Sequence, residues 1–218
     1  FLAIDFARKE IVGTEYAAVV RDGLMGSFLP GDPVALVLLR DRLRDVRAEH
    51  DATLRTGDMA ERFAQSLQSA ADDGSAPVRP QERGALLRQG RELLTTVANQ
   101  SNLILDPDLD SYYVMSLTML RYPELLQVVH DTLGFLLARP APRPQQAVPG
   151  PHRAAELLTL VGRLDAVLVG IDSDFDQAFI AGKPALRERL GPTRHALQTS
   201  GQALQALLQR VAQGEVGP

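Results

Sequence analysis

The chain has 218 residues, of which 45% are hydrophobic and 23% charged, and its formal net charge is −4. This is the composition of an ordinary globular protein, and it lacks the basic footprint of a nucleic-acid-binding domain. The absence of cysteine excludes disulfides, a thiolate nucleophile and zinc–thiolate sites. No apolar run approaches the ~20 residues that span a bilayer. The start at Phe1, in the middle of an apparent helix, leads us to expect an excised fragment of a longer protein.

Apolar residues recur at helical spacing along the whole chain, and no segment alternates with period two for long enough to predict a strand. The second predicted helix is interrupted at Thr56-Gly57-Asp58, which we interpret as a kink. Another helix is bent at Pro123, or is divided there into two, because proline removes a backbone donor. The pattern predicts six long helices, over residues 1–26, 33–71, 80–105, 108–138, 152–181 and 185–212.

The inward faces follow from the same spacing. The first helix is expected to bury Leu2, Ile4, Tyr16 and Leu24, and the second Leu36, Leu39, Leu43 and Val46. The sixth repeats apolar residues every seven positions, which predicts packing against its own bundle or a second protomer: Leu190, Leu197, Leu204 and Val211. The longest predicted stripe belongs to the fifth helix: Leu157, Leu160, Leu164, Val167, Ile171 and Phe175.

The predicted fold is therefore all-α, an antiparallel up-and-down bundle of about six long helices, with two stacked four-helix modules as the alternative. We expect a single domain over residues 1–218. Residues 139–151 hold five of the 14 prolines and predict a solvated connection that takes no part in binding. Six antiparallel passes would bring Phe1 and Pro218 to the same end of the bundle.

The sequence carries no recognisable catalytic or metal-binding motif. The four histidines fall on separate segments, and there is no nucleophile elbow, P-loop or dinucleotide fingerprint. Two acidic triplets, Asp106/Asp108/Asp110 and Asp172/Asp174/Asp176, lack the glycine and glutamate that an EF-hand loop needs at its sixth and twelfth positions. We predict neither enzyme activity nor a cofactor, and we interpret both triplets as helix caps or solvated faces.

The most informative stretch runs from Asn99 to Glu124. Asp106 before Pro107 is a strong helix-start signal, and acidic residues in the following turn suit the positive end of the helix dipole. Capping does not explain the adjacent Tyr112 and Tyr113 or the following Arg121. The run L-x-L-D-P-D-L-D-S-Y-Y-x-M, followed by R-x-P-E-L, resembles a segment of extracytoplasmic sensor domains in bacterial transmembrane receptors, chiefly methyl-accepting chemotaxis proteins.

A second, weaker resemblance lies in the first predicted helix, which reads K-E-I-V-G-T-E-Y and then V-V-R-D-G-L-M-G-S-F-L-P-G-D. It is similar to the first helix of those sensors and of nitrate-sensing-type helical domains, Q-x-H-R-G-L-x-x-x-x-L-x-G-D. The family's arginine before the glycine is replaced by Asp22 here, and Arg21 stands one place earlier. One position turns a helical side chain by about 100°, so Arg21 points to a different side of the helix from the family's arginine.

The candidate ligand-binding residues are Tyr112, Tyr113, Arg121, Asp110, Arg21 and Arg40. Phenol hydroxyls beside guanidinium forks would form a cradle for a carboxylate or another anion. The alternative is that one tyrosine packs in the core while the other lies at an edge, and that each arginine forms a surface ion pair. Organic acids, amino acids, nitrogen oxyanions and purines are all candidate ligands.

The resemblance implies a periplasmic, ligand-binding sensor domain of an inner-membrane receptor, homodimeric, which binds a small polar molecule between helices and relays a signal across the membrane. Membrane contact would be made by flanking segments outside this chain, and nucleic acid is not an expected partner. Two alternatives stay open. One is a structural dimerisation bundle without a ligand of its own, and the other is a cytosolic helical adaptor.

Overall fold

The computed structural model describes residues 2–28, 31–73, 78–103, 108–138 and 151–213, and every regular element in these ranges is helical. The all-α prediction is therefore confirmed. The elements are α1 (Leu2–Phe28), α2 (Pro33–Leu54), α3 (Gly57–Asp72), α4 (Pro80–Gln100), α5 (Leu109–Ser116), the π-helical turn η2 (Leu117–Arg121), α6 (Tyr122–Leu137), α7 (Pro151–Ala181) and α8 (Pro184–Ala212).

Contacts divide the chain into two compact units, an N-terminal unit (Phe1–Pro123) and a C-terminal unit (Glu124–Pro218). That the two form one domain over residues 1–218 stays a prediction. The predicted corner at Asp106–Pro107 and most of the proline-rich connection 139–151 lie outside the described residues. So do Phe1 and Pro218, so the expectation that they lie at one end is not tested.

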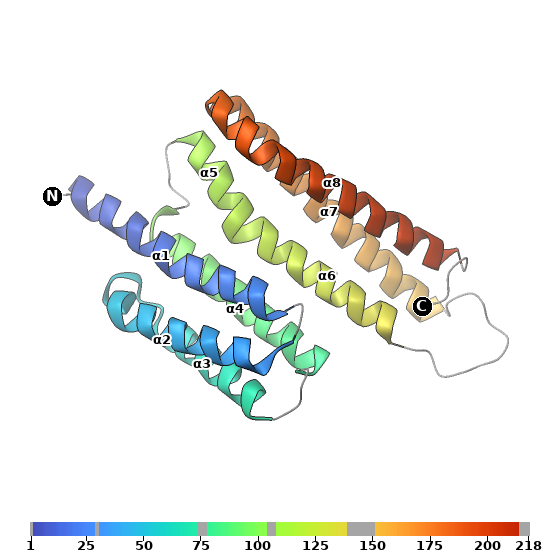
Figure 1. Ribbon diagram of the computed structural model, residues 1–218, viewed down its shortest axis with the longest axis horizontal. Helices are drawn as coiled ribbons and strands as arrows, with labels where there is room; N and C mark the ends of the chain where they lie inside the picture. Colours follow the sequence, from blue (N-terminus) through green and yellow to red (C-terminus); the bar gives the residue numbers. More distant parts are fainter. Residues whose placement is uncertain (1, 29–30, 74–77, 104–107, 139–150, 214–218) are drawn as a thin grey trace. The chain divides into compact units, whose positions relative to one another are not determined.

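Within the N-terminal unit, α1 packs on α2 and α4, α2 packs on α3, and α3 packs on α4, so the four helices form a closed ring of neighbours (Figure 1). The core between them holds large side chains from all four helices: Tyr16, Leu24, Leu36, Leu39, Leu43, Phe63, Leu67, Leu87, Leu93 and Leu94. The stripe predicted for residues 33–54 is buried throughout. The stripe predicted for the first helix is wrong at Ile4, which is 72% exposed.

Two glycines allow α1 to approach its neighbours closely. A Cβ at Gly90 of α4 would lie 2.7 Å from the side chain of Leu24, and one at Gly13 would lie 2.1 Å from the Cβ of Ser101. Distances under 3.0 Å are too short for real Cβ contacts. At Gly13, where the nearest atom is a Cβ, the close approach therefore depends on the missing side chain, whereas at Gly90 the end of the Leu24 side chain could shift.

The predicted kink at Thr56-Gly57-Asp58 is wrong, because the chain reverses there. Arg55 adopts the left-handed conformation, with φ of 49°, and its N–H donates to the carbonyl of Asp51 at 2.7 Å, which ends α2. The start signals at Pro33 and Pro80 were more reliable: α2 and α4 each begin with proline, which loses nothing by lacking an N–H in the first turn. Residues 33–71 thus form a hairpin of two helices.

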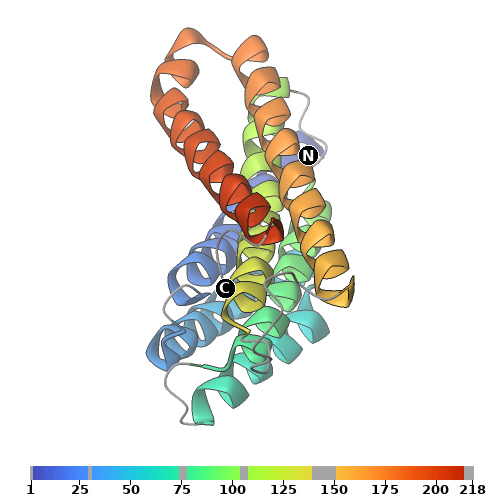
Figure 2. The same ribbon diagram turned by 90° about the vertical axis from the view of Figure 1, so that its right-hand side faces the viewer.

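In the C-terminal unit, α7 and α8 form an antiparallel pair (Figures 1 and 2). All six residues of the predicted α7 stripe are buried. The pair is joined by Arg194 of α8, whose guanidinium contacts Asp172 and Asp176 of α7 at 2.6 Å each. The heptad residues of α8 are less buried than expected, since among them only Val211 is fully covered.

Helix α6 is held to α7 by two arginines. Arg153 donates to the carbonyl oxygen of Phe135 at 2.9 Å and lies over its ring, 4.2 Å from the centroid. Arg163 pairs with Asp131 at 2.7 Å. Ion pairs and a cation–π contact thus supplement the apolar packing of the C-terminal unit.

Candidate functional site

The tyrosine segment forms α5, and its two rings are in contact. Tyr112 and Tyr113 have ring centroids 5.1 Å apart and planes at 80°, the edge-to-face arrangement that aromatic pairs prefer. Both residues are half-buried, so neither is a fully packed core side chain nor a free surface group. Asp110 lies in the first turn, where its carboxylate accepts the N–H of Ser111 at 2.9 Å.

A π-helical turn, Leu117–Arg121, follows the last residue of α5. In this turn the N–H of Tyr122 bonds to the carbonyl of Leu117, five residues back, where an α-helix would use the residue four back. Pro123 is buried immediately after it. Proline has no N–H and its ring crowds the carbonyl four residues earlier, so a wider turn here removes a clash. The helical residues continue through Leu137 without a break, so the predicted division into two helices is wrong, while the predicted bend at Pro123 stays a prediction.

The predicted arginines lie on three different elements. Arg21 of α1 pairs with Asp22 at 2.7 Å, and Arg40 of α2 pairs with Asp41 at 2.6 Å. Both are surface ion pairs with the next residue in the chain, the alternative that the sequence left open. Arg121 is half-buried and belongs to the π turn itself. Of the predicted residues, Tyr112, Tyr113, Asp110 and Arg121 thus share the continuous α5–η2 segment.

A buried hydrogen-bond chain in the N-terminal unit was not predicted. Thr56 donates to the carboxylate of Asp51 at 3.0 Å, and the hydroxyl of Tyr16 lies 3.0 Å from the same Thr56 oxygen. Because Thr56 has a single hydroxyl hydrogen, Tyr16 is the donor in its bond to Thr56. The sequence identified Tyr16 as inward-facing, but no local signal pairs it with a residue 40 positions away.

Burial determines the direction of the pKa shift of Tyr16 in this hydrogen-bond chain. Tyr16 has no exposed surface, and burial raises the pKa of its hydroxyl above the usual value, outweighing the opposite effect of the bond to Thr56. Thr56 precedes the first residue of α3, yet its side chain makes no capping bond, because its oxygen is committed to Tyr16 and Asp51. The hydrogen-bond chain therefore joins α1 to the α2–α3 turn, and α3 begins without a side-chain cap.

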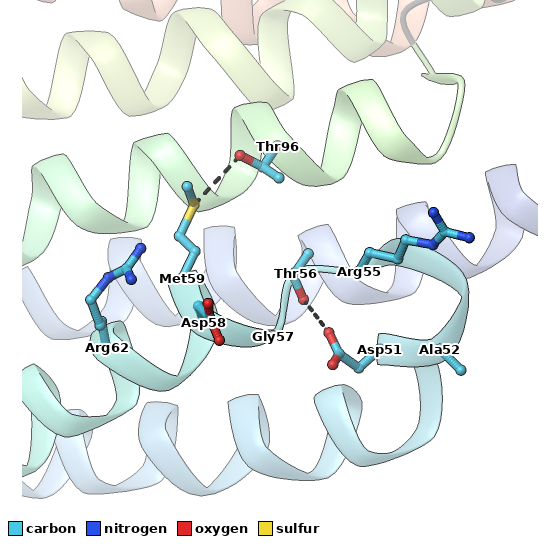
Figure 3. A pocket seen from close by; sticks show the side chains of 9 residues that line it. All are labelled: Asp51, Ala52, Arg55, Thr56, Gly57, Asp58, Met59, Arg62 and Thr96. Carbon is cyan, nitrogen blue, oxygen red and sulfur yellow. Dashed lines mark hydrogen bonds between the residues drawn. The ribbon is translucent and has the colours of Figure 1, made fainter.

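An open depression of about 520 Å³ lies beside this turn (Figure 3). Its polar rim carries charges of both signs, two carboxylates and two guanidinium groups, and the hydroxyl of Thr96 contacts the sulfur of Met59 at 3.4 Å. The depression is of the size that small ligands occupy in proteins. Nine residues line it: Asp51, Ala52, Arg55, Thr56, Gly57, Asp58, Met59, Arg62 and Thr96.

Two kinds of feature are absent from the described ranges, a metal-binding cluster and a membrane-spanning helix. No group of three or more His, Cys, Asp or Glu side chains in this part of the chain is arranged to hold a metal ion. In the acidic triplet of α7, Asp172 and Asp176 are the partners of Arg194. Among the helices as described, none is long and apolar enough to cross a membrane.

Comparisons with protein families, with curated proteins and with solved structures found no significant match.

Proposed function

We propose that this chain is the periplasmic sensor domain of a bacterial transmembrane receptor, which binds a small polar molecule and acts as a homodimer. One observation carries the proposal: the helix that holds Tyr112 and Tyr113, the core of the segment that resembles such sensors, passes into a π turn at Leu117. Such turns are rare and occur frequently at functional sites. The π turn also ends two residues before the boundary between the two compact units.

The proposed ligand site lies at the α5–η2 segment. Tyr112, Tyr113 and Arg121 are half-buried residues, and phenol hydroxyls and a guanidinium are hydrogen-bond donors that suit a carboxylate or another small anion. A ligand bound there would alter the balance between π and α hydrogen bonding in the segment. A change of register between two discrete arrangements is the kind of element that can transmit a signal.

The test is a thermal-shift screen of small carboxylates, amino acids, nitrogen oxyanions and purines, followed by calorimetry on the best compound. Tyr113→Phe should weaken its binding about tenfold, because a buried polar group that loses its partner costs about 1–3 kcal/mol. Arg62→Ala, in the depression at the α2–α3 turn, is the comparison variant. A loss confined to Arg62→Ala would move the ligand site to the depression, and a screen without any stabilising compound would contradict the proposal.

A second candidate is a structural dimerisation bundle that has no ligand of its own. It is favoured by three large apolar residues of α7 that are exposed: Leu158, Val169 and Ile180. The two candidates differ in one measurement, because a structural bundle dimerises without being stabilised by any small molecule.

A further inference from the structure

The depression beside the α2–α3 turn, which we call the α2–α3 depression, has a floor that belongs to the core of the N-terminal unit. Thr56 lines it although this residue is only 2% exposed, and its hydroxyl donates to Asp51, which also lines it. The hydroxyl of Tyr16 bonds to Thr56 from α1. Polar groups inside a protein are normally held by such bonds, so this floor is part of the fold and not a gap between surface side chains.

The absence of a side chain at Gly57 leaves space beside the carboxylate of Asp51. A Cβ added there would lie 3.3 Å from Oδ2 and 4.0 Å from Oδ1 of Asp51, and no side chain outside its chain neighbours would be nearer. Oδ1 accepts the bond from Thr56, and no hydrogen bond joins Oδ2 to another described residue. An ionised carboxylate oxygen only accepts hydrogen bonds, so this atom suits the ammonium group of a ligand.

The rim adds a positive and a negative charge next to each other. Asp58 and Arg62 are four residues apart on α3, so their side chains are neighbours on one face of the helix. No ion pair or hydrogen bond joins either side chain to another residue in the described ranges. Figure 3 shows Arg55 and Arg62 on either side of Thr56, so guanidinium groups flank the depression. Neighbouring opposite charges suit a ligand that carries both an ammonium and a carboxylate.

Met59 supplies an apolar wall between α3 and α4. Its sulfur accepts the hydroxyl of Thr96 at 3.4 Å, and Ala52 of α2 lines the depression as well. A thioether is polarisable and adapts to apolar or aromatic groups. The volume of about 520 Å³ leaves room for a large side chain beside the two charged groups of the ligand.

We propose that the α2–α3 depression binds a free α-amino acid with a large apolar side chain. The carboxylate of the amino acid binds the guanidinium of Arg62, and its ammonium binds the carboxylates of Asp51 and Asp58. Its side chain lies against Met59. The inference goes beyond the proposed function, because this site lies outside the α5–η2 segment and does not depend on it.

The buried hydrogen-bond chain connects this site to α1. Thr56 has a single hydroxyl hydrogen, which it donates to Asp51, so a ligand that draws Asp51 toward itself also moves the oxygen to which Tyr16 donates. Tyr16 has no exposed surface, and close packing around it passes such a displacement to α1 itself. Binding in the depression therefore alters the environment of α1.

Titration of the isotope-labelled chain with L-phenylalanine, followed by amide NMR, tests the site. A ligand of this size at an open site has a dissociation constant of about 1 mM, so the titration extends to about 20 mM. Amides of residues 51–62 should shift. Hydrocinnamate lacks the ammonium and phenethylamine lacks the carboxylate, so each should bind about tenfold more weakly. Unshifted amides in this range, or equal binding of the three compounds, would overturn the proposal.

Two variants test the named contacts. Arg62→Ala should weaken the binding of L-phenylalanine about tenfold, whereas Arg88→Ala, which removes an exposed guanidinium from α4 outside the depression, should leave it unchanged. Gly57→Ala should keep the melting temperature, since alanine favours a helix, yet weaken binding because its methyl occupies the space beside Asp51. Undiminished binding in both Arg62→Ala and Gly57→Ala would overturn the site.

Tyr16→Phe tests the connection to α1. In the parent, the amides of residues 15–17 should shift together with those of the depression. In Tyr16→Phe, which lacks the hydroxyl, they should stay in place while L-phenylalanine still shifts residues 51–62. Shifts that are confined to the depression in the parent would overturn the connection.

Failure here is distinguishable from failure of the proposed function. If L-phenylalanine shifts only residues 109–121, the depression is not its site, and the proposed site at α5–η2 is supported. If it shifts residues 51–62 and no compound of the screen shifts residues 109–121, the inference is supported and the proposed ligand site is contradicted. Tyr113→Phe should not change binding in the depression.

Discussion

At the scale of single residues, the buried chain from Tyr16 through Thr56 to Asp51 is the feature with the clearest measurable consequence. It connects α1 to the α2–α3 turn through two hydrogen bonds of 3.0 Å. The Tyr16 hydroxyl is completely buried, and burial raises its pKa. The burial and the raised pKa both show that the folded state holds the hydroxyl proton of Tyr16 tightly.

Tyr16→Phe should lower the free energy of unfolding at pH 7 by about 1 kcal/mol, the usual value of one internal hydrogen bond. Thr56 keeps its bond to Asp51, so no buried donor is orphaned. Urea unfolding of the two proteins measures the difference. Tyr113→Phe is the control, because its half-buried hydroxyl should contribute less. Equal losses in both variants would contradict a special role for the buried chain.

The pH dependence of this difference has a definite sign. The folded state holds the Tyr16 proton more tightly than the unfolded state, whose pKa is about 10. Stability from this group is therefore complete below pH 10 and falls as the pH rises above it. The parent should lose stability between pH 10 and 11 more steeply than Tyr16→Phe. Burial also raises the pKa of Tyr122, so the variant should keep part of the slope. Parallel curves would contradict the assignment.

At the scale of elements, two prolines inside helices are accommodated in different ways. Pro123 is buried and follows the π turn, whereas Pro192 is exposed and lies within a stretch of α8 that keeps α-helical assignment. Both lack the N–H that would continue the ladder. At Pro123 the helix widens, and the N–H of Tyr122 reaches Leu117.

Pro123→Ala should convert the π turn to α-helix. The new N–H at position 123 can bond to the carbonyl of Met119, and the N–H of Tyr122 can move to that of Thr118. Hydrogen exchange followed by NMR should show a newly protected amide at position 123. The control is Pro192→Ala, which should gain one protected amide without changing the register of its neighbours. A π turn that persists in Pro123→Ala would show that tertiary packing, and not proline, maintains it.

At the scale of the whole molecule, the two compact units differ in how they are built. The N-terminal unit closes a ring of four helices around a core with many fully buried side chains. In the C-terminal unit, α7 contributes a continuous buried stripe, but α8 buries only Gly201, Leu208 and Val211 among its described residues. Ion pairs such as those of Arg194 supplement the packing there, and partly exposed ion pairs contribute little to stability.

Residues 1–123 expressed alone should therefore fold, with helical circular dichroism and a cooperative thermal transition. Residues 124–218 alone should melt at a lower temperature or with a broader transition, because less apolar surface is buried per helix. The comparison decides between one folding domain and two modules. An unfolded fragment 1–123 would show that the units depend on each other and would favour the single domain predicted from the sequence.

The sequence by itself determined where most of the helices lie. Helical periodicity identified the long helices and the whole buried stripe of α7, because a helix repeats every 3.6 residues and its buried side is visible locally. Proline at a first helical position marked where α2 and α4 begin. The pairing of Arg21 and Arg40 with neighbouring aspartates was also within reach, since it needs only adjacent residues.

Tertiary structure decided what depends on distant residues or on backbone geometry. The reversal at Arg55 arises because this one residue adopts the left-handed conformation. That conformation is uncommon for residues other than glycine, so the sequence gives no sign of it. Ile4 has helical spacing but no neighbour to cover it, so periodicity alone misplaced it. Tyr16 and Thr56 meet only because α1 packs on α2. In the π turn, hydrogen bonds join residues five apart and not four apart, as they would in an α-helix. The buried Pro123 is the cause of this difference. Local patterns fix which side of a helix is apolar, while the fold decides what lies against it.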